Sequence, residues 1–174
     1  MAVVGLFYGS DTGNTENIAK MIQKQLGSEL VDIRDIAKSS KEDIEAYDFL
    51  LFGIPTWYYG EAQCDWDDFF PTLEQIDFTD KLVAIFGCGD QEDYADYFCD
   101  AMGTILNIVE PHGAIIVGHW PTEGYTFESS QALVDDNTFV GLCIDEDRQP
   151  ELTSERVNKW VKQVYDEMCL AELA

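Results

Sequence analysis

The chain has 174 residues, which corresponds to one domain with a hydrophobic core, and we expect a single domain over residues 1–174. Its 34 acidic residues against 10 Lys and Arg give a formal net charge of -24, yet 46% of the residues are hydrophobic, so the chain is not a disordered acidic tail. A surface this negative repels phosphate backbones and anionic lipid. The composition therefore argues against nucleic acid and membranes as partners and favours proteins with basic docking faces.

The predicted strands are short runs that are apolar on successive residues, as is typical of strands buried on both faces of a parallel sheet. They lie at residues 3–8, 49–54, 82–87, 114–118 and 139–144, with a weaker candidate at 29–32. Apolar residues at helical spacing occupy residues 18–26, 98–109 and 157–168, and Thr153 is the expected N-cap of the last helix.

Strands that alternate with helices form βαβ units, so we predict an α/β fold with a doubly wound parallel sheet and helices on both faces. Residues 119–138 interrupt this alternation with Pro121, Gly124 and scattered polar residues, and we interpret them as an insertion. Folds of this class bind ligands at the loops beyond the carboxyl ends of their strands.

Cysteine and histidine usage indicates neither a disulfide framework nor a metal site. The cysteines are odd in number and contain no Cys-x-x-Cys pair, which is typical of free thiols in a cytoplasmic protein. His112 and His119 have no second ligand at zinc-like spacing. No run approaches the roughly 18 apolar residues of a membrane span, and the start of the chain has no basic leader. We expect a cytoplasmic protein without a metal.

The first strand is followed by the polar loop 9–16, Gly-Ser-Asp-Thr-Gly-Asn-Thr-Glu, which opens into the first helix. Its hydroxyls, amide and glycines lie at the positive end of the helix dipole, where phosphate groups bind. The Lys-Ser or Lys-Thr pair of a triphosphate loop is missing, so we expect a phosphate monoester held by neutral donors. The alternative is a polar turn that only caps the helix.

Two further loops follow strands. Residues 55–60 place Trp57, Tyr58 and Tyr59 side by side, and an exposed aromatic cluster of this kind favours a flat aromatic ligand. Residues 87–94 contain Gly87-x-Gly89, but Glu92 stands where a dinucleotide fingerprint needs its third glycine, so we reject that interpretation.

The three loops, in this order and each after a strand, resemble those of flavodoxins, small electron-transfer proteins that carry FMN. The resemblance covers essentially the whole chain and is closest to the long-chain flavodoxins of enteric and related gamma-proteobacteria. It implies a five-stranded sheet in the order 2-1-3-4-5, with the last strand split by the insertion. It also implies a low-potential, one-electron carrier with non-covalently bound FMN and no substrate turnover.

By this resemblance the FMN phosphate is held by Ser10, Asp11, Thr12, Gly13, Asn14 and Thr15. Trp57 and Tyr94 stack on the two faces of the flavin, and the peptide between Tyr58 and Tyr59 meets flavin N5. The backbone of Gly89, Asp90 and Gln91 meets the pyrimidine edge, and Asp147 lies near the site. The remaining expected cofactor contacts are Pro55, Thr56, Gly60, Cys88, Tyr97, Phe98 and Cys99.

Position 58 departs from many long-chain relatives, in which a smaller residue is common. In the resemblance, the 58–59 peptide flips so that it can accept a hydrogen bond from the protonated flavin N5. A bulky residue at position 58 makes this flip more costly. No nucleophile-base pair or paired carboxylates can be picked from the loops, so no catalytic residue is expected.

Two alternatives share parts of this pattern. An FMN-dependent quinone or nitro reductase would share the phosphate loop but needs a nicotinamide pocket, for which the sequence shows no feature. A receiver-type signalling module needs an Asp at the end of its third strand, where this chain has residues 53–56, Gly-Ile-Pro-Thr.

The expected partners are basic-faced redox proteins, such as a flavodoxin/ferredoxin NADP reductase and electron-accepting enzymes, and the expected state is a monomer. Residues 61–100 concentrate the negative charge, since Lys81 is the only base among them. The acids expected to steer a basic reductase are Asp65, Asp67, Asp68, Asp93, Asp96 and Asp100.

Overall fold

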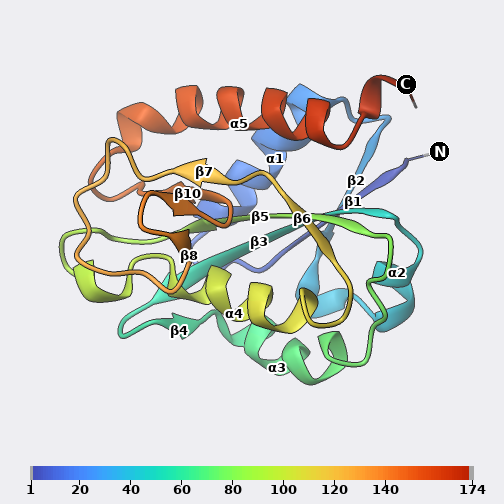
Figure 1. Ribbon diagram of the computed structural model, residues 1–174, viewed down its shortest axis with the longest axis horizontal. Coiled ribbons are helices and arrows are strands. Elements are labelled where there is room, and N and C mark those ends of the chain that lie inside the picture. The colour runs from blue at the N-terminus through green and yellow to red at the C-terminus, as the bar shows by residue number, and fades with distance from the viewer. Residues whose placement is uncertain (1, 173–174) are drawn as a thin grey trace.

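A parallel sheet with helices on both faces forms the centre of the chain (Figure 1). The computed structural model describes residues 2–172; Met1, Leu173 and Ala174, at the ends of the predicted domain, lie outside the described residues. The four main strands are β1 Val4–Tyr8, β2 Val31–Asp35, β3 Phe49–Trp57 and β5 Leu82–Cys88. They lie in the order β2-β1-β3-β5, which confirms the predicted topology.

The fifth position of the sheet is shared by two short strands, as the resemblance predicted. β6 (Ile115–Val117) pairs with the first half of β5, and β10 (Leu142–Ile144) pairs with its second half. The chain between them forms a small antiparallel sheet from β7 (Trp120–Pro121), β9 (Thr138–Phe139) and β8 (Leu133–Asp135). The prediction of one strand over 139–144 is therefore wrong, because its first residue belongs to the inserted sheet.

The helices divide between the two faces of the sheet. α1 (Asn14–Leu26) and α5 (Thr153–Glu167) cover one face, and α3 (Cys64–Leu73) and α4 (Asp100–Val109) cover the other (Figure 1). A short helix, α2, spans Lys41–Glu45. Four 3-10 turns lie at Ile36–Lys38, Ala95–Tyr97, Pro150–Leu152 and Leu170–Glu172. No helix in the described range is both long and apolar enough to span a membrane.

Several predicted boundaries were wrong for local reasons. β2 starts two residues later than expected, because a turn in which Leu30 N–H donates to the Gly27 carbonyl precedes it. Thr153 is the first helical residue of α5 rather than its N-cap, since the 3-10 turn at Pro150–Leu152 runs directly into the helix. The five cysteines are free, as predicted.

The functional end of the sheet is set by the direction of its strands. All main strands are parallel, so their carboxyl ends lie together at the left of Figure 1. The side chains of β1, β3 and β5 are mostly buried on both faces, with Leu6, Phe7, Leu51 and Phe52 fully inaccessible, whereas the edge strand β2 is partly exposed. The loops that leave this edge are therefore held by a rigid core.

Candidate functional site

The loop between β1 and α1 presents unused hydrogen-bond donors. Gly13 adopts φ 94° at the helix N-cap, and its N–H donates to Ser10 Oγ at 3.0 Å. The N–H groups of Asn14, Thr15 and Glu16 have no acceptor among residues 2–172. Together with the helix dipole, these three donors make the start of α1 an anion-binding position.

The second loop is shorter than predicted. Residues 55–57 continue β3, and β4 (Glu61–Ala62) pairs with Thr56 and Trp57, so only residues 58–60 form the turn. The prediction of a loop at 55–57 is therefore wrong, because β4 supplies a partner strand that the sequence pattern did not reveal. Gly60 has φ 86°, and a side chain there would meet Asp100 Oδ2 at 2.8 Å.

Tyr58 occupies the left-handed region with φ 46°, which is strained for a non-glycine residue by about 1–2 kcal/mol. The residue is 57% exposed, and its ring meets the Tyr94 ring edge-on at a centroid distance of 6.1 Å. Backbone strain of this kind is concentrated at ligand sites.

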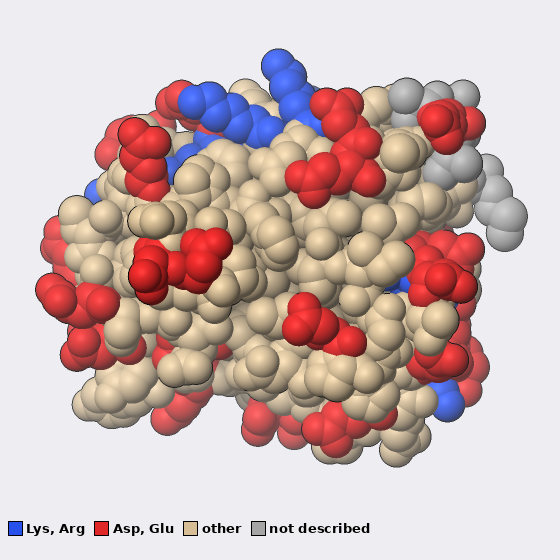
Figure 2. Space-filling model, viewed as in Figure 1, with Lys and Arg blue, Asp and Glu red and all other residues tan. Residues whose placement is uncertain are grey.

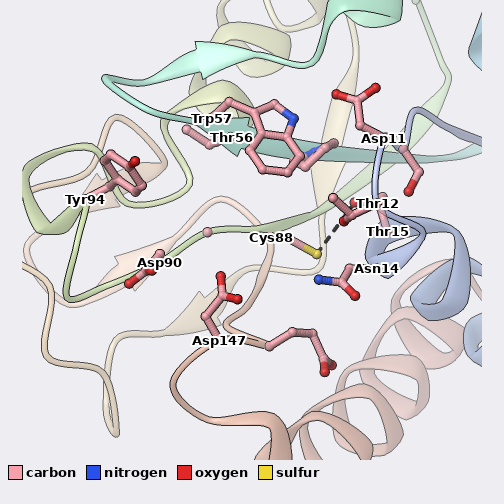
Figure 3. Close-up of a pocket in the computed structure, with 14 residues that line it drawn as sticks. Asp11, Thr12, Asn14, Thr15, Thr56, Trp57, Cys88, Asp90, Tyr94 and Asp147 are labelled. Carbon is pink, nitrogen blue, oxygen red and sulfur yellow. Dashed lines mark hydrogen bonds between the residues drawn. The ribbon is translucent and has the colours of Figure 1, made fainter.

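Trp57 carries a polar atom without a partner. Its Nε1 is buried and has no hydrogen-bond acceptor within the described part of the chain. Figure 3 shows the indole beside Thr56, with its nitrogen on the side of Asp11. Buried N–H groups are almost always hydrogen-bonded, so an unpaired one indicates a missing acceptor. A ligand bound beside the first loop could supply that acceptor.

The third loop packs tightly against α4. A side chain at Gly89 would lie 3.0 Å from the Cys99 nitrogen, so the backbone approaches closely there. Burial raises the pKa of the Cys88 thiol to about 12, so it stays protonated. Thr15 Oγ1 donates to Cys88 Sγ at 3.6 Å, and this contact joins the first and third loops (Figure 3).

One pocket lies between these loops (Figure 3). Its lining residues are Ser10, Asp11, Thr12, Asn14, Thr15, Pro55, Thr56, Trp57, Cys88, Gly89, Asp90, Tyr94, Glu146 and Asp147. All of them except Glu146 belong to the predicted site. Glu146 was missed, although its position two residues after the end of β10 and next to Asp147 was a usable signal.

The other predicted site residues do not line this pocket. They are Gly13, Tyr58, Tyr59, Gly60, Gln91, Tyr97, Phe98 and Cys99. Tyr58, Tyr59 and Tyr97 are exposed at its rim, where Tyr59 meets the Tyr94 and Tyr97 rings at 6.5 and 5.7 Å. Phe98 and Cys99 are fully buried and pack against Gly89, where a side chain would lie 3.0 Å from the Cys99 nitrogen and from Phe98 Cδ1. Their contact with the cofactor stays a prediction.

Four acids and no Lys or Arg are found among the described residues that line the pocket. Burial opposes the charge of Asp90, but hydrogen bonds from Arg148 and from the Asp93 and Glu92 N–H groups outweigh it and lower the pKa of Asp90. The pKa of Asp147 is raised by burial first and then by the charges of Asp90 and Asp145. An anion bound here must be held by neutral donors.

Asp11 also meets Cys64 and Asp65 outside the pocket, with ligand-type atoms within 4.8 Å of one another. Gln63 Nε2 donates to Asp11 Oδ1 at 3.1 Å and to Asp65 Oδ2 at 2.7 Å. Because an amide N–H already occupies the space between the two carboxylates, we assign no metal to this group.

The family model, the sequence relatives and the solved structure that match this chain are all flavodoxins. A family model described as flavodoxin matches residues 6–160. The chain is 86% identical over 174 residues to the flavodoxin of Haemophilus influenzae, covering 100% of each. It is 76% identical over 173 residues to flavodoxin 1 of Escherichia coli K12, covering 99% of this chain and 98% of that one. The crystal structure of Fusobacterium nucleatum flavodoxin bound to flavin mononucleotide superposes with a TM-score of 0.90 at 32% identity, covering 96% and 99%.

Proposed function

Because the chain belongs to the flavodoxin family, as its sequence predicted, we propose that it binds FMN non-covalently in this pocket and carries single electrons at low potential. The observation that carries the proposal is the pairing of unused donors with aromatic rings. Three N–H groups without an acceptor in the described part of the chain start α1, and the Trp57 ring, whose Nε1 has no partner there either, lines the same pocket as Tyr94. Such a pocket suits a ligand that is anionic at one end and flat at the other.

The phosphate would be held by the N–H groups at the start of α1 and by the side chains of Ser10, Thr12, Asn14 and Thr15. Trp57 and Tyr94 would cover the two faces of the ring and exclude water from it. The remaining predicted residues that line the pocket, Pro55, Thr56, Cys88, Gly89 and Asp90, would form its walls. The flavin supplies the redox chemistry when bound, and the protein sets its affinity and environment.

We further propose that the protein acts as a carrier without substrate turnover of its own. The lining residues contain no nucleophile paired with a base, and the Cys88 thiol is kept protonated by burial. The competing function, an FMN-dependent quinone or nitro reductase, is tested by adding NADPH and an acceptor. Steady NADPH oxidation by the purified protein alone would support the enzyme and contradict the carrier.

The proposed partners are basic-faced redox proteins, such as a flavodoxin/ferredoxin NADP reductase and electron-accepting enzymes, met by a monomer in the cytoplasm. Acidic side chains are scattered over the visible face in Figure 2 and line much of its outline, while most of the Lys and Arg seen there lie along the upper edge, over α5. An acidic surface beside the pocket would favour encounter with a basic partner.

A visible spectrum of the purified protein tests the cofactor assignment. We expect a yellow protein whose colour is released by acid as FMN, and whose bound flavin fluorescence is quenched by the stacked rings. Trp57→Ala should weaken FMN binding and restore emission, whereas Trp57→Phe, which keeps a ring, should retain most of the quenching. Failure of apoprotein to bind added FMN would overturn the proposal.

A further inference from the structure

Arg148 joins three carboxylates of the third loop. It lies in the turn after β10, and its Nε and Nη2 contact Asp90 Oδ1 and Oδ2 at 3.0 and 3.2 Å. Nη1 lies 3.3 Å from Glu92 Oε2, and Nη2 lies 2.8 Å from Asp93 Oδ2. We call these four residues the Arg148 cluster.

The cluster differs from the other ion pairs of the described chain, each of which joins one cation to one acid. The Asp90 side chain is only 12% exposed and accepts both arms of the guanidinium, a geometry that lysine cannot reproduce. Fixed bidentate pairs contribute far more order than exposed single pairs do. The hydrogen bond to Asp90 raises the pKa of Arg148 further, so its charge is permanent.

The turn that carries Arg148 is itself fixed by a buried acid. Asp145 is fully inaccessible, and its Oδ1 accepts the N–H groups of Asp147 and Arg148 at 3.1 and 2.9 Å. Its Oδ2 accepts the Gln91 N–H at 3.0 Å, across the gap between the two loops. Arg148 is therefore presented to the third loop from a rigid base.

The third loop leads directly into the pocket wall. Asp90 and Tyr94 both line the pocket, and the Tyr94 N–H donates to the Asp90 carbonyl at 3.2 Å. Fixing the Asp90 side chain thus fixes the turn that presents the Tyr94 ring. Without a counter-charge, the acids at positions 90, 92 and 93 would repel one another and Asp147.

We propose that Arg148 is a positioning residue of the pocket, which holds the Tyr94 turn in its binding conformation and offsets the negative charge beside the ligand. The inference rests on the proposed binding of FMN, because the charge effect is read on the flavin. Its geometric part concerns the protein alone and can be tested without the cofactor.

The test compares R148Q, R148K and R34Q with the natural chain. Arg34 of β2 pairs with Asp43 of α2 at 3.5 Å. R34Q therefore removes one positive charge and one ion pair outside the pocket lining. Amide hydrogen exchange of apoprotein reports the order of residues 90–94, fluorescence titration reports FMN affinity, and a redox titration separates the two one-electron steps.

In R148Q, we expect exchange at residues 90–94 to quicken about tenfold and FMN affinity to fall about tenfold. Affinity for fully reduced flavin should fall about threefold more than for half-reduced flavin, which lowers the second potential by roughly 28 mV at ~59 mV per tenfold. R148K keeps the charge but loses the fork, so it should show faster exchange with the second potential nearly unchanged. R34Q should match the natural chain in all three measurements.

Natural exchange rates in both Arg148 variants would overturn the positioning role, even if FMN affinity changed. Faster exchange with unchanged affinity and potentials in R148Q would overturn the link to the pocket. If the natural chain itself failed to bind FMN, the proposed function would fall, while the exchange rates would still decide whether Arg148 orders the loop.

Discussion

Thr12 and Thr15 differ in how freely their hydroxyls can serve an anion at the start of α1. Thr15 is almost fully buried and its hydroxyl already donates to Cys88, whereas Thr12 is exposed in the loop. Both line the pocket, but only Thr12 has a hydroxyl without a partner among the described residues. Thr12 is therefore the cleaner position at which to test the neutral phosphate site.

We predict that Thr12→Ala weakens FMN binding by about ten- to a hundredfold. Losing one charge-assisted hydrogen bond to a phosphate that has no cationic partner costs roughly 1.5–3 kcal/mol. Fluorescence titration of apoprotein measures the change. Thr12→Ser keeps the hydroxyl and should bind nearly as the natural chain does, and riboflavin, which lacks the phosphate, should bind both variants alike. Equal FMN affinity of the alanine and natural forms would mean that Thr12 does not hold the phosphate.

Asp100 provides a pH-dependent term in the stability of the fold. The residue is 8% exposed, its carboxylate accepts the Gln131 N–H at 2.7 Å and lies against Gly60, and burial raises its pKa. A raised folded-state pKa means that folding binds a proton between the unfolded value of about 3.9 and the folded value. The contribution of Asp100 to stability therefore falls as the pH rises through that window.

We predict that Asp100→Asn becomes more stable relative to the natural apoprotein as the pH rises from about 4 to about 7. Urea unfolding at a series of pH values measures this difference. Asp136→Asn, an exposed change in the turn between β8 and β9, is the control. A stability difference that is constant with pH would show that Asp100 titrates alike in the folded and unfolded chain.

At the scale of elements, the sequence revealed the buried strands well and the connections between them poorly. β1, β3 and β5 are apolar on successive residues because both faces are covered, and that pattern is visible in the chain. α2 has only five residues and α3 contains Pro71, so neither shows a clear helical period. Their formation depends on packing that no local pattern encodes.

The location of the pocket could be predicted from the sequence, but the contacts that join its loops could not. Three loops at strand ends carry readable residue types, so their convergence follows from the parallel topology. The Thr15–Cys88 contact and the Arg148 cluster depend instead on which loops meet and at what distance. The left-handed backbone of Tyr58 could not be predicted either, because a bulky residue gives no sign that the chain adopts this conformation.

The junction between the inserted sheet and β10 makes a prediction about stability. A side chain at Gly141 would lie 1.7 Å from the Ile85 carbonyl oxygen, so the backbone of the two segments must separate. We expect Gly141→Ala to destabilise apoprotein by about 3 kcal/mol in urea unfolding. At Gly13 φ is 94°, but apart from its chain neighbours no described residue has an atom within 4 Å of the added side chain, so Gly13→Ala should cost only about 1–2 kcal/mol. Similar losses at both positions would contradict the close approach.

On the scale of the whole molecule, charge is distributed unevenly around the pocket end. Helices that follow parallel strands start at the carboxyl edge, so the first turn of α3 and the turn at Ala95–Tyr97 lie near the pocket. Asp67, Asp68 and Asp96 are exposed there. Two other acids that were predicted to steer a partner are less suited to that role, because Asp93 pairs with Arg148 and Asp100 is buried.

We predict that converting Asp67, Asp68 and Asp96 together to Asn slows association with a basic reductase about three- to tenfold at low ionic strength. Exposed acids raise the on-rate through a long-range field, which salt screens within about 10 Å at 0.1 M. The variant should therefore also show a flatter dependence of the on-rate on salt, measured by stopped flow. Removing negative charge near the flavin should in addition raise its second reduction potential.

The matched control neutralises Glu74, Glu110 and Asp166, exposed acids at or near the carboxyl ends of α3, α4 and α5. Those ends lie at the opposite edge of the sheet, so the control changes net charge equally but leaves the pocket end acidic. If both triple variants slow association to the same extent, net charge alone drives the encounter. If neither changes the on-rate or the potential, the acidic end of the molecule serves solubility rather than partner docking.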